Sequence, residues 1–300
     1  MIKTKNSRQY TIGGIRFKAN FLCPFFRFDT EGGSFYFQED KTDCEHEWIL
    51  NYNASHTTNA INWETIFHGS ESFDVDLPYK WSVVRIDKAD AIYVEFEDDP
   101  NIINALATID IKNNQVNIDL TIRNNQPFSF DPFIHPLGIL VLQYLVYLYG
   151  GFVIHASTVS YRNKGFLFSA VSGTGKSTMA NIWKQYGATI INDDRLIILP
   201  HKDGFKAFNT PMQYYKDKSK EVVLHKVFLI NQSPNNYIKQ LPVLKGALGM
   251  LGNCMQFQYD EHQINSRLEA LIKISEGCGV YECGFKPDKE IVELILKELA

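Results

Sequence analysis

With 300 residues, of which 45% are apolar and 21% charged, the chain has the composition of a soluble globular protein with one large domain or two ordinary ones. Its formal net charge of -4 and the lack of a dense Lys/Arg run argue against a nucleic-acid partner. The five cysteines include no CxxC pair, which argues against a disulfide framework and a zinc site and favours a cytoplasmic protein with reduced thiols.

The sequence predicts neither a signal peptide nor a membrane-spanning segment. Residues 1–10 are polar and lack an apolar h-region, so we expect no signal peptide. The longest apolar run, residues 137–154, is divided by Gly150 and Gly151. Its helical part is about 20 Å long, too short to cross a hydrocarbon layer of about 30 Å. We therefore expect a buried helix over residues 137–149, capped by glycine, and no membrane partner.

Residues 1–126 are predicted to form a β-rich N-terminal domain of unknown role. Segments rich in β-branched and aromatic residues alternate there with turn signals. The predicted strands lie within residues 9–19, 34–37, 81–86, 91–96 and 116–122. Residues 109–122 are predicted to form a hairpin around Asn113 and Asn114, because apolar residues alternate on both sides of that turn.

Residues 127–300 are predicted to form an α/β domain. The boundary is placed between Asn124 and Pro136, where three prolines interrupt regular structure. Beyond it, apolar runs of strand length and helix length alternate. In the C-terminal third we predict strands over residues 222–230 and 279–283 and helices over residues 243–251, 262–275 and 287–299.

Two apolar runs, residues 152–159 and 165–170, are predicted to pair as a hairpin. If the turn centres near Asn163, His155 lies opposite about residue 171, where a glycine-containing loop begins. This position makes His155 a candidate functional residue. The alternative is a strand histidine whose hydrogen bonds are satisfied by its neighbours.

The loop after the second run has the sequence Ala170-Val-Ser-Gly-Thr-Gly-Lys-Ser-Thr178. A buried strand precedes it and a helical pattern follows, which is the setting of a phosphate-binding P-loop, the Walker A motif. In such a loop the backbone N–H groups and the helix N-terminus surround a phosphate. The predicted nucleotide-binding residues are Ser172, Gly173, Thr174, Gly175, Lys176, Ser177 and Thr178.

Two side chains of this loop carry specific roles in the prediction. Lys176 is expected to reach the β- and γ-phosphate oxygens, and Ser177 to offer its hydroxyl to Mg²⁺. The first glycine of the G-x-x-x-x-G-K-[ST] pattern is replaced by Ala170, which is tolerable if that residue has a negative φ. The alternative is a Ser/Gly loop that binds no ligand.

Asp193 and Asp194 follow the predicted helix after one further short strand. An eleven-residue helix rises about 16 Å, and a five-residue strand returns about 16 Å. In a right-handed crossover this strand shares a sheet with the strand before the loop, so both aspartates are expected beside the phosphates. Neighbouring residues on an extended backbone face opposite ways, which predicts separate roles for the two carboxylates. The alternative is a surface Asp-Asp turn.

The succession of His155 with its strand, the loop of residues 172–178 and the Asp193–Asp194 pair resembles the HPr kinase/phosphorylase family and its HPr-kinase-like relatives. These share a fold with ATP-dependent phosphoenolpyruvate carboxykinase. The resemblance covers about residues 150–212 and implies ATP-dependent phosphorylation of a serine hydroxyl. It further implies that His155 positions the reacting phosphate, that one aspartate is the general base, and that Ser177 and an aspartate hold Mg²⁺. A Gly-rich signature that follows the phosphate site in HPr kinases is missing here.

The predicted function is therefore an ATP- and Mg²⁺-dependent kinase that transfers the γ-phosphoryl group to a hydroxyl, as in a serine. The acceptor is a peptide, a protein or a small molecule, and a homo-oligomer is possible. We assign Asp193 as the general base and Asp194 to the Mg²⁺ side, with Lys176 and His155 completing the catalytic group. The alternative is a nucleotide-binding module without transfer, acting as a sensor or an assembly partner.

Overall fold

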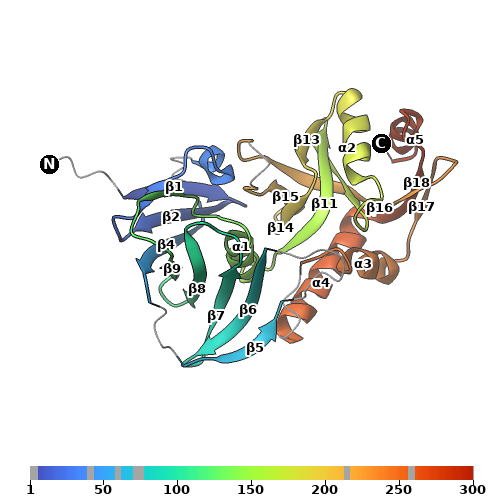
Figure 1. The fold of residues 1–300 in the computed structure, drawn as a ribbon. Helices are drawn as coiled ribbons and strands as arrows, with labels where there is room; N and C mark the ends of the chain where they lie inside the picture. The colour runs from blue at the N-terminus through green and yellow to red at the C-terminus, as the bar shows by residue number, and fades with distance from the viewer. Residues whose placement is uncertain are drawn as a thin grey trace. The chain divides into compact units, whose positions relative to one another are not determined.

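The computed structural model describes residues 6–38, 44–57, 62–69, 78–212, 217–255 and 261–299. It is an α/β protein with mixed sheets and a β-rich N-terminal region, as the sequence predicted at that level (Figure 1). Contacts between Cα atoms divide the chain into two compact units. The N-terminal unit contains Met1–Leu142 and Pro211–Ser219, and the C-terminal unit contains Gln143–Thr210 and Lys220–Ala300.

The N-terminal unit is built on one eight-stranded sheet. The predicted hairpin over residues 109–122 is confirmed, whereas the segment 9–19 is two strands joined at Gly13 and Gly14, both with positive φ. Paired φ values of this kind give the tight turn that suits strand twist. In spatial order the strands are β1 (Ser7–Ile12), β2 (Ile15–Phe21), β4 (His46–Ser55), β9 (Gln115–Ile122), β8 (Ile102–Asp110), β7 (Ala89–Phe96), β6 (Tyr79–Ile86) and β5 (Glu64–His68).

The strand predicted over residues 34–37 is wrong. These residues form a 3-10 helix, η1 (Gly33–Phe37). The backbone N–H of Ser34 donates to the Asp131 carboxylate at 3.2 Å, and Phe37 is fully buried. A carboxylate nearly a hundred residues away thus holds the first turn of η1, which no local pattern reports.

The proline-rich segment belongs to the N-terminal unit. Within it β10 (Phe128–Phe130) pairs in parallel with β3 (Phe26–Phe28). Phe133 packs edge-on against Tyr10 and Phe17, with ring centroids 5.6 and 5.4 Å apart. The division between the units therefore falls after Leu142, later than the boundary expected at residue 126.

Helix α1 (Leu137–Tyr147) contains this division and ends two residues earlier than predicted, before Gly150 with its φ of 71°. Its apolar residues are buried. Among the helices that the structure describes, none is both long and apolar enough to span a membrane.

The second large sheet forms the C-terminal unit and closes on itself. β12 pairs with β11 on one edge and with β16 on the other, so β11, β14, β15, β16 and β12 form a ring. Apolar side chains from these strands make one core with α3 and α4. In spatial order the strands are β12 (Lys164–Ser169), β11 (Phe152–Tyr161), β14 (Arg195–His201), β15 (Gly204–Asn209), β16 (Glu221–Gln232), β18 (Val280–Phe285) and β17 (Tyr237–Gln240), while β13 (Thr189–Asn192) also pairs with β11.

Four helices of the C-terminal unit pack against two different faces of these strands. α3 (Val243–Leu251) and α4 (Glu261–Cys278) contribute to the core with the ring, and α2 (Lys176–Gln185) and α5 (Glu290–Leu299) contribute to a separate core with Phe168 and Phe228. The strands and helices predicted in the C-terminal third are confirmed, although α5 begins at Glu290 rather than at residue 287. Helix α5 is amphipathic, and its buried residues, Ile291, Val292 and Ile295, lie on one stripe.

Candidate functional site

The β11–β12 hairpin has the predicted pairing to within one residue. Its two-residue turn consists of Arg162 and Asn163, with φ values of 50° and 62°. The ladder runs from Tyr161 opposite Lys164 to Ala156 opposite Ser169. His155 is the next residue along β11, and the loop of interest starts directly after Ser169. The structure thus places His155 at the base of that loop.

Residues 170–175, here called the glycine loop, connect β12 to α2. Gly173 has a φ of 78° and Gly175 a φ of 109°, and a Cβ at Gly173 would meet nothing within 4 Å. These backbone values favour glycine, which has no Cβ to clash. Ala170 is not among the described non-glycine residues with positive φ, so alanine in place of the first glycine causes no strain.

Lys176, the first residue of α2, folds back over the glycine loop. Its Nζ donates to the carbonyl oxygens of Ala170 at 3.0 Å and Val171 at 3.2 Å. The residue is only 7% exposed, and this burial lowers the pKa of the amine, while the nearby Asp194 carboxylate acts in the opposite direction. The Lys176 amine is therefore held against the carbonyl oxygens of the first two residues of the glycine loop.

Ser157 fixes α2 to the neighbouring strand β11. Its Oγ, fully buried, donates to the carbonyl oxygen of Lys176 at 3.1 Å. Sequence reasoning missed this residue, and its only signal was a small hydroxyl within an apolar strand. The bond ties the start of the helix to the strand that carries His155.

Asp193 and Asp194 form a bend between β13 and β14 rather than an extended strand end. Both strands pair antiparallel with β11, and β11 also pairs with β12, so the predicted shared sheet is confirmed. The Ala156 N–H donates to the Asp194 carbonyl at 3.0 Å, and the Asp194 N–H donates to Asn192 Oδ1 at 2.8 Å. The expected strand-like alternation of the two carboxylates therefore does not apply, because the bend sets their directions.

The Asp194 carboxylate lies between two basic side chains. Its Oδ1 is 3.3 Å from His155 Nε2, and its Oδ2 is 3.7 Å from Arg195 Nη1. His155 and Arg195 are directly paired residues of β11 and β14, which explains why both reach the same carboxylate. All three side chains are partly exposed, so the group is accessible from solvent.

The predicted site residues fall into two sets. Lys176, His155 and Asp194 come together, and Arg195, which was not a predicted site residue, joins them. Asp193 lies in the bend and is partly exposed. The remaining predicted positions line the glycine loop and the first turn of α2, where Ser172, Gly173, Ser177 and Thr178 are exposed and Thr174 and Gly175 partly exposed.

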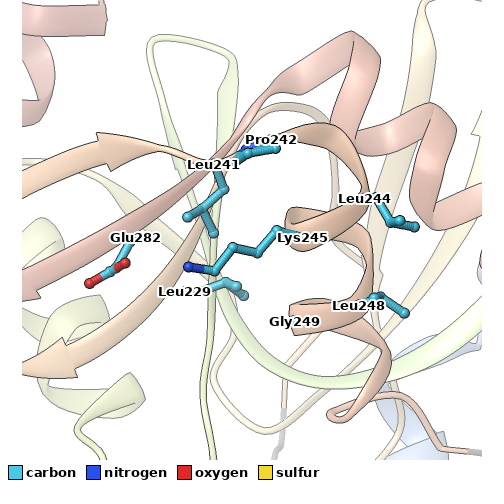
Figure 2. A pocket seen from close by; sticks show the side chains of 8 residues that line it. All are labelled: Leu229, Leu241, Pro242, Leu244, Lys245, Leu248, Gly249 and Glu282. Carbon is cyan, nitrogen blue, oxygen red and sulfur yellow. The ribbon is translucent and has the colours of Figure 1, made fainter.

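Two hollows open in the C-terminal unit. The first, of about 490 Å³, borders the glycine loop and is lined by Gly175, Thr178, Gln232, Ser233, Pro234, Phe285 and Pro287. The second, of about 710 Å³, lies between α3 and the strands β16 to β18, and Lys245 stretches across it from α3 toward the strands (Figure 2). It is lined by Leu229, Leu241, Pro242, Leu244, Lys245, Leu248, Gly249 and Glu282.

Comparisons with known proteins bear on the C-terminal part of the chain. The model of one family, described as SynChlorMet cassette protein ScmC, matches residues 137–275. Among solved structures, the chain is similar to the Hpr(Ser) kinase/phosphatase from Coxiella burnetii, with 11% identity, a TM-score of 0.28 and coverage of 49% of this chain and 92% of that chain. No curated protein matches the chain.

Proposed function

We propose that the protein is an ATP- and Mg²⁺-dependent phosphotransferase that moves the γ-phosphoryl group to a hydroxyl. One observation carries the proposal: a buried lysine amine sits in a glycine loop between a strand and a helix, next to a histidine of β11 and an aspartate of the bend between β13 and β14. Transfer of a phosphoryl group depends mainly on positioning and charge neutralisation, and these groups supply both. We further propose that the acceptor hydroxyl is a serine of a peptide or protein, or that of a small molecule.

The glycine loop has the properties that a triphosphate requires. A Cβ at Gly173 would enter open space, so the backbone there is free for the approach of a ligand. The amine of Lys176 has its hydrogen bonds on carbonyl oxygens of the loop, which phosphate oxygens would replace with a gain in charge complementarity. The N-terminus of α2 adds partial positive charge at the same place.

Ser177 and Asp194 fit the metal of the proposal. A hydroxyl and a carboxylate are hard oxygen donors, which Mg²⁺ prefers, and it usually takes only one or two from the protein and the rest from phosphates and water. In keeping with that, the described residues include no cluster of three or more His, Cys, Asp or Glu that would form a complete metal site. When bound, Mg²⁺ neutralises phosphate charge.

The remaining roles belong to groups of the chain itself. In the proposed step the acceptor oxygen bonds to the γ-phosphorus, the bond from phosphorus to the β–γ bridging oxygen breaks, and ADP leaves. Asp193 accepts the acceptor's proton, and His155 and Lys176 hold the transferring group. The contact of Asp194 Oδ1 with His155 Nε2 at 3.3 Å supports this arrangement, because it holds the imidazole beside the glycine loop.

The test is incubation of the protein with γ-labelled ATP, Mg²⁺ and a lysate of the source organism. We expect label in one peptide, protein or metabolite, and at least about a thousandfold less label with Lys176→Met, because the charge clamp on the phosphates is lost. ATP binding without any transfer would instead support a nucleotide-binding module. Unchanged labelling and ATP affinity in Lys176→Met would remove the proposal.

A further inference from the structure

The hollow beside the glycine loop, called here the Phe285 hollow, has a wall chemistry that differs from the phosphate side. Every residue that lines it is uncharged, and Phe285, Pro234 and Pro287 make its apolar side. Gln232 and Ser233 are its polar members besides Thr178. The charged groups of the site, Lys176 with the His155–Asp194 pair, line the loop and not this hollow.

Hydrogen bonds between its two outer walls hold the Phe285 hollow in shape. The Ser233 N–H donates to the Phe285 carbonyl at 3.1 Å. Asn236 then joins the walls twice: its Nδ2 donates to Asp288 Oδ1 at 3.0 Å, and its Oδ1 accepts from the Lys286 N–H at 2.8 Å. A cavity whose walls are bonded in this way is formed before any ligand arrives, which is the usual state of small-molecule sites.

The direction of α2 connects this hollow with the phosphate end. Lys176 and Thr178 are two residues apart on a helix, so their side chains point about 200° away from each other around its axis. Lys176 is buried and faces the glycine loop and Asp194, whereas Thr178 is exposed and lines the hollow. Gly175 belongs to the glycine loop and also lines the hollow, so a nucleotide with its phosphates in the loop has its nucleoside next to the Phe285 hollow.

We infer that the Phe285 hollow binds the nucleoside half of the nucleotide whose phosphates the glycine loop holds. This inference rests on the proposed function and adds to it the residues that recognise the base and ribose. Its volume of about 490 Å³ lies within the range of small-molecule sites. An apolar lining of two prolines and a phenylalanine suits a planar base, and the Gln232 amide and Ser233 suit its polar edge or the ribose hydroxyls.

The experiment compares two ligands that share the phosphates and differ in the nucleoside. Mg²⁺-ATP and Mg²⁺-tripolyphosphate are titrated calorimetrically into the wild-type protein and the variants Phe285→Leu and Gln232→Ala. We expect Phe285→Leu to weaken ATP about tenfold, because the smaller side chain removes apolar contact at the wall of the hollow, and Gln232→Ala to weaken it about threefold through one lost hydrogen bond. Tripolyphosphate affinity should stay within about twofold in both variants, because only the nucleoside contacts change.

Phe228→Leu is the matched control. Phe228 belongs to the same core as Phe285 and is also fully buried, but it does not line the hollow. It should lower the melting temperature as Phe285→Leu does and leave both affinities unchanged. If the ratio of ATP to tripolyphosphate affinity is the same in the wild type, Phe285→Leu and Gln232→Ala, the inference is overturned.

Failure of the proposed function has a different signature. If neither ligand binds the wild-type protein, the phosphate site is absent, and both proposals fall. If ATP binds with the expected dependence on Phe285 and Gln232 but no acceptor is ever labelled, the transferase proposal fails while the nucleoside site stands.

Discussion

Polar side chains have different surroundings at two places in the molecule, the middle of the N-terminal sheet and the strands around the glycine loop. On the N-terminal sheet, Asn20 Nδ2 donates to Asn51 Oδ1 at 3.0 Å and Asn51 Nδ2 donates to Asn117 Oδ1 at 3.1 Å, a ladder across β2, β4 and β9. Around the glycine loop, each of three fully buried residues has a side-chain atom without a hydrogen-bond partner in the described structure. They are Thr158, Ser169 and Asn192.

The two places differ in whether the polar groups satisfy one another. A cross-strand amide ladder satisfies its own donors and acceptors and so stabilises the sheet. Unsatisfied buried groups cost free energy, and strand interruptions such as the Asp193–Asp194 bend weaken a ladder. Such atoms occur in both units, Thr11 Oγ1 of β1 among them, and those of Thr158, Ser169 and Asn192 are the ones that lie on the strands around the glycine loop.

The largest effect that would sharpen this contrast concerns the two aspartates. Asp193→Asn should lower kcat by roughly 10²–10⁴-fold and leave ATP affinity nearly intact, because it removes a positioned base. Asp194→Asn should raise the Mg²⁺ concentration needed for half-maximal rate, because one charge leaves the proposed metal site. Steady-state rates across a Mg²⁺ titration check both. Full activity in both variants would show that the bend is an ordinary surface turn.

A smaller effect is expected at the glycines of the loop. Gly175→Ala should cost more than Gly173→Ala in ATP affinity and stability, because a Cβ at Gly175 would lie 3.0 Å from Phe285 Cζ whereas at Gly173 it meets open space. The shared backbone strain is about 1 kcal/mol in each case, since both glycines have positive φ. Urea unfolding and ATP titration of the two variants measure the difference. Equal losses in both would mean that the Phe285 contact is irrelevant.

The amide ladder of the N-terminal unit should matter for stability and not for activity. Asn51→Ala should destabilise the protein by about 1 kcal/mol, since it removes a residue bonded on both sides near the surface. Its effect on ATP affinity and transfer should be nil. Thermal unfolding and the labelling assay check the two statements. A loss of transfer without a loss of stability would contradict the expectation that this ladder serves stability alone.

The smallest effect concerns how many cysteine thiols react with a thiol reagent in the folded protein. Burial raises the pKa of the Cys254 and Cys283 thiols to about 12 and that of Cys278 to about 11, and it raises the pKa of Cys23 as well. Only thiolates react quickly, so at pH 8 we expect Ellman's reagent to modify the partly exposed Cys44 alone. Unfolding in guanidinium should make all five cysteines reactive. Cys44→Ser should show no fast reaction.

Local patterns in the sequence sufficed for the elements around the site. The strand, loop and helix from residue 164 to residue 185 follow from an apolar run, glycines and a helical pattern, and the hairpin that positions His155 follows from two apolar runs and a short turn. The three helices after residue 220 and the strands β16 and β18 were predictable for the same reason, whereas the short strand β17 was not predicted.

Features that depend on contacts between distant residues escaped prediction. The bend at Asp193 and Asp194 exists because β13 and β14 both pair with β11, and the Ser157 bond to α2 depends on that same strand. The 3-10 helix over residues 33–37 depends on Asp131. Periodicity describes which face of an element is apolar, but it contains no information on which partner that element meets.

The closed ring of strands also predicts slow hydrogen exchange in β12, the strand that leads into the glycine loop. β12 is hydrogen-bonded on both edges, to β11 and β16, so its amides have no open edge toward solvent. Amide protons at Phe166, Leu167 and Phe168 should exchange with deuterium only when the whole C-terminal unit opens. The loop above can then reshape around a ligand while the strand beneath it remains as the most persistent part of the unit.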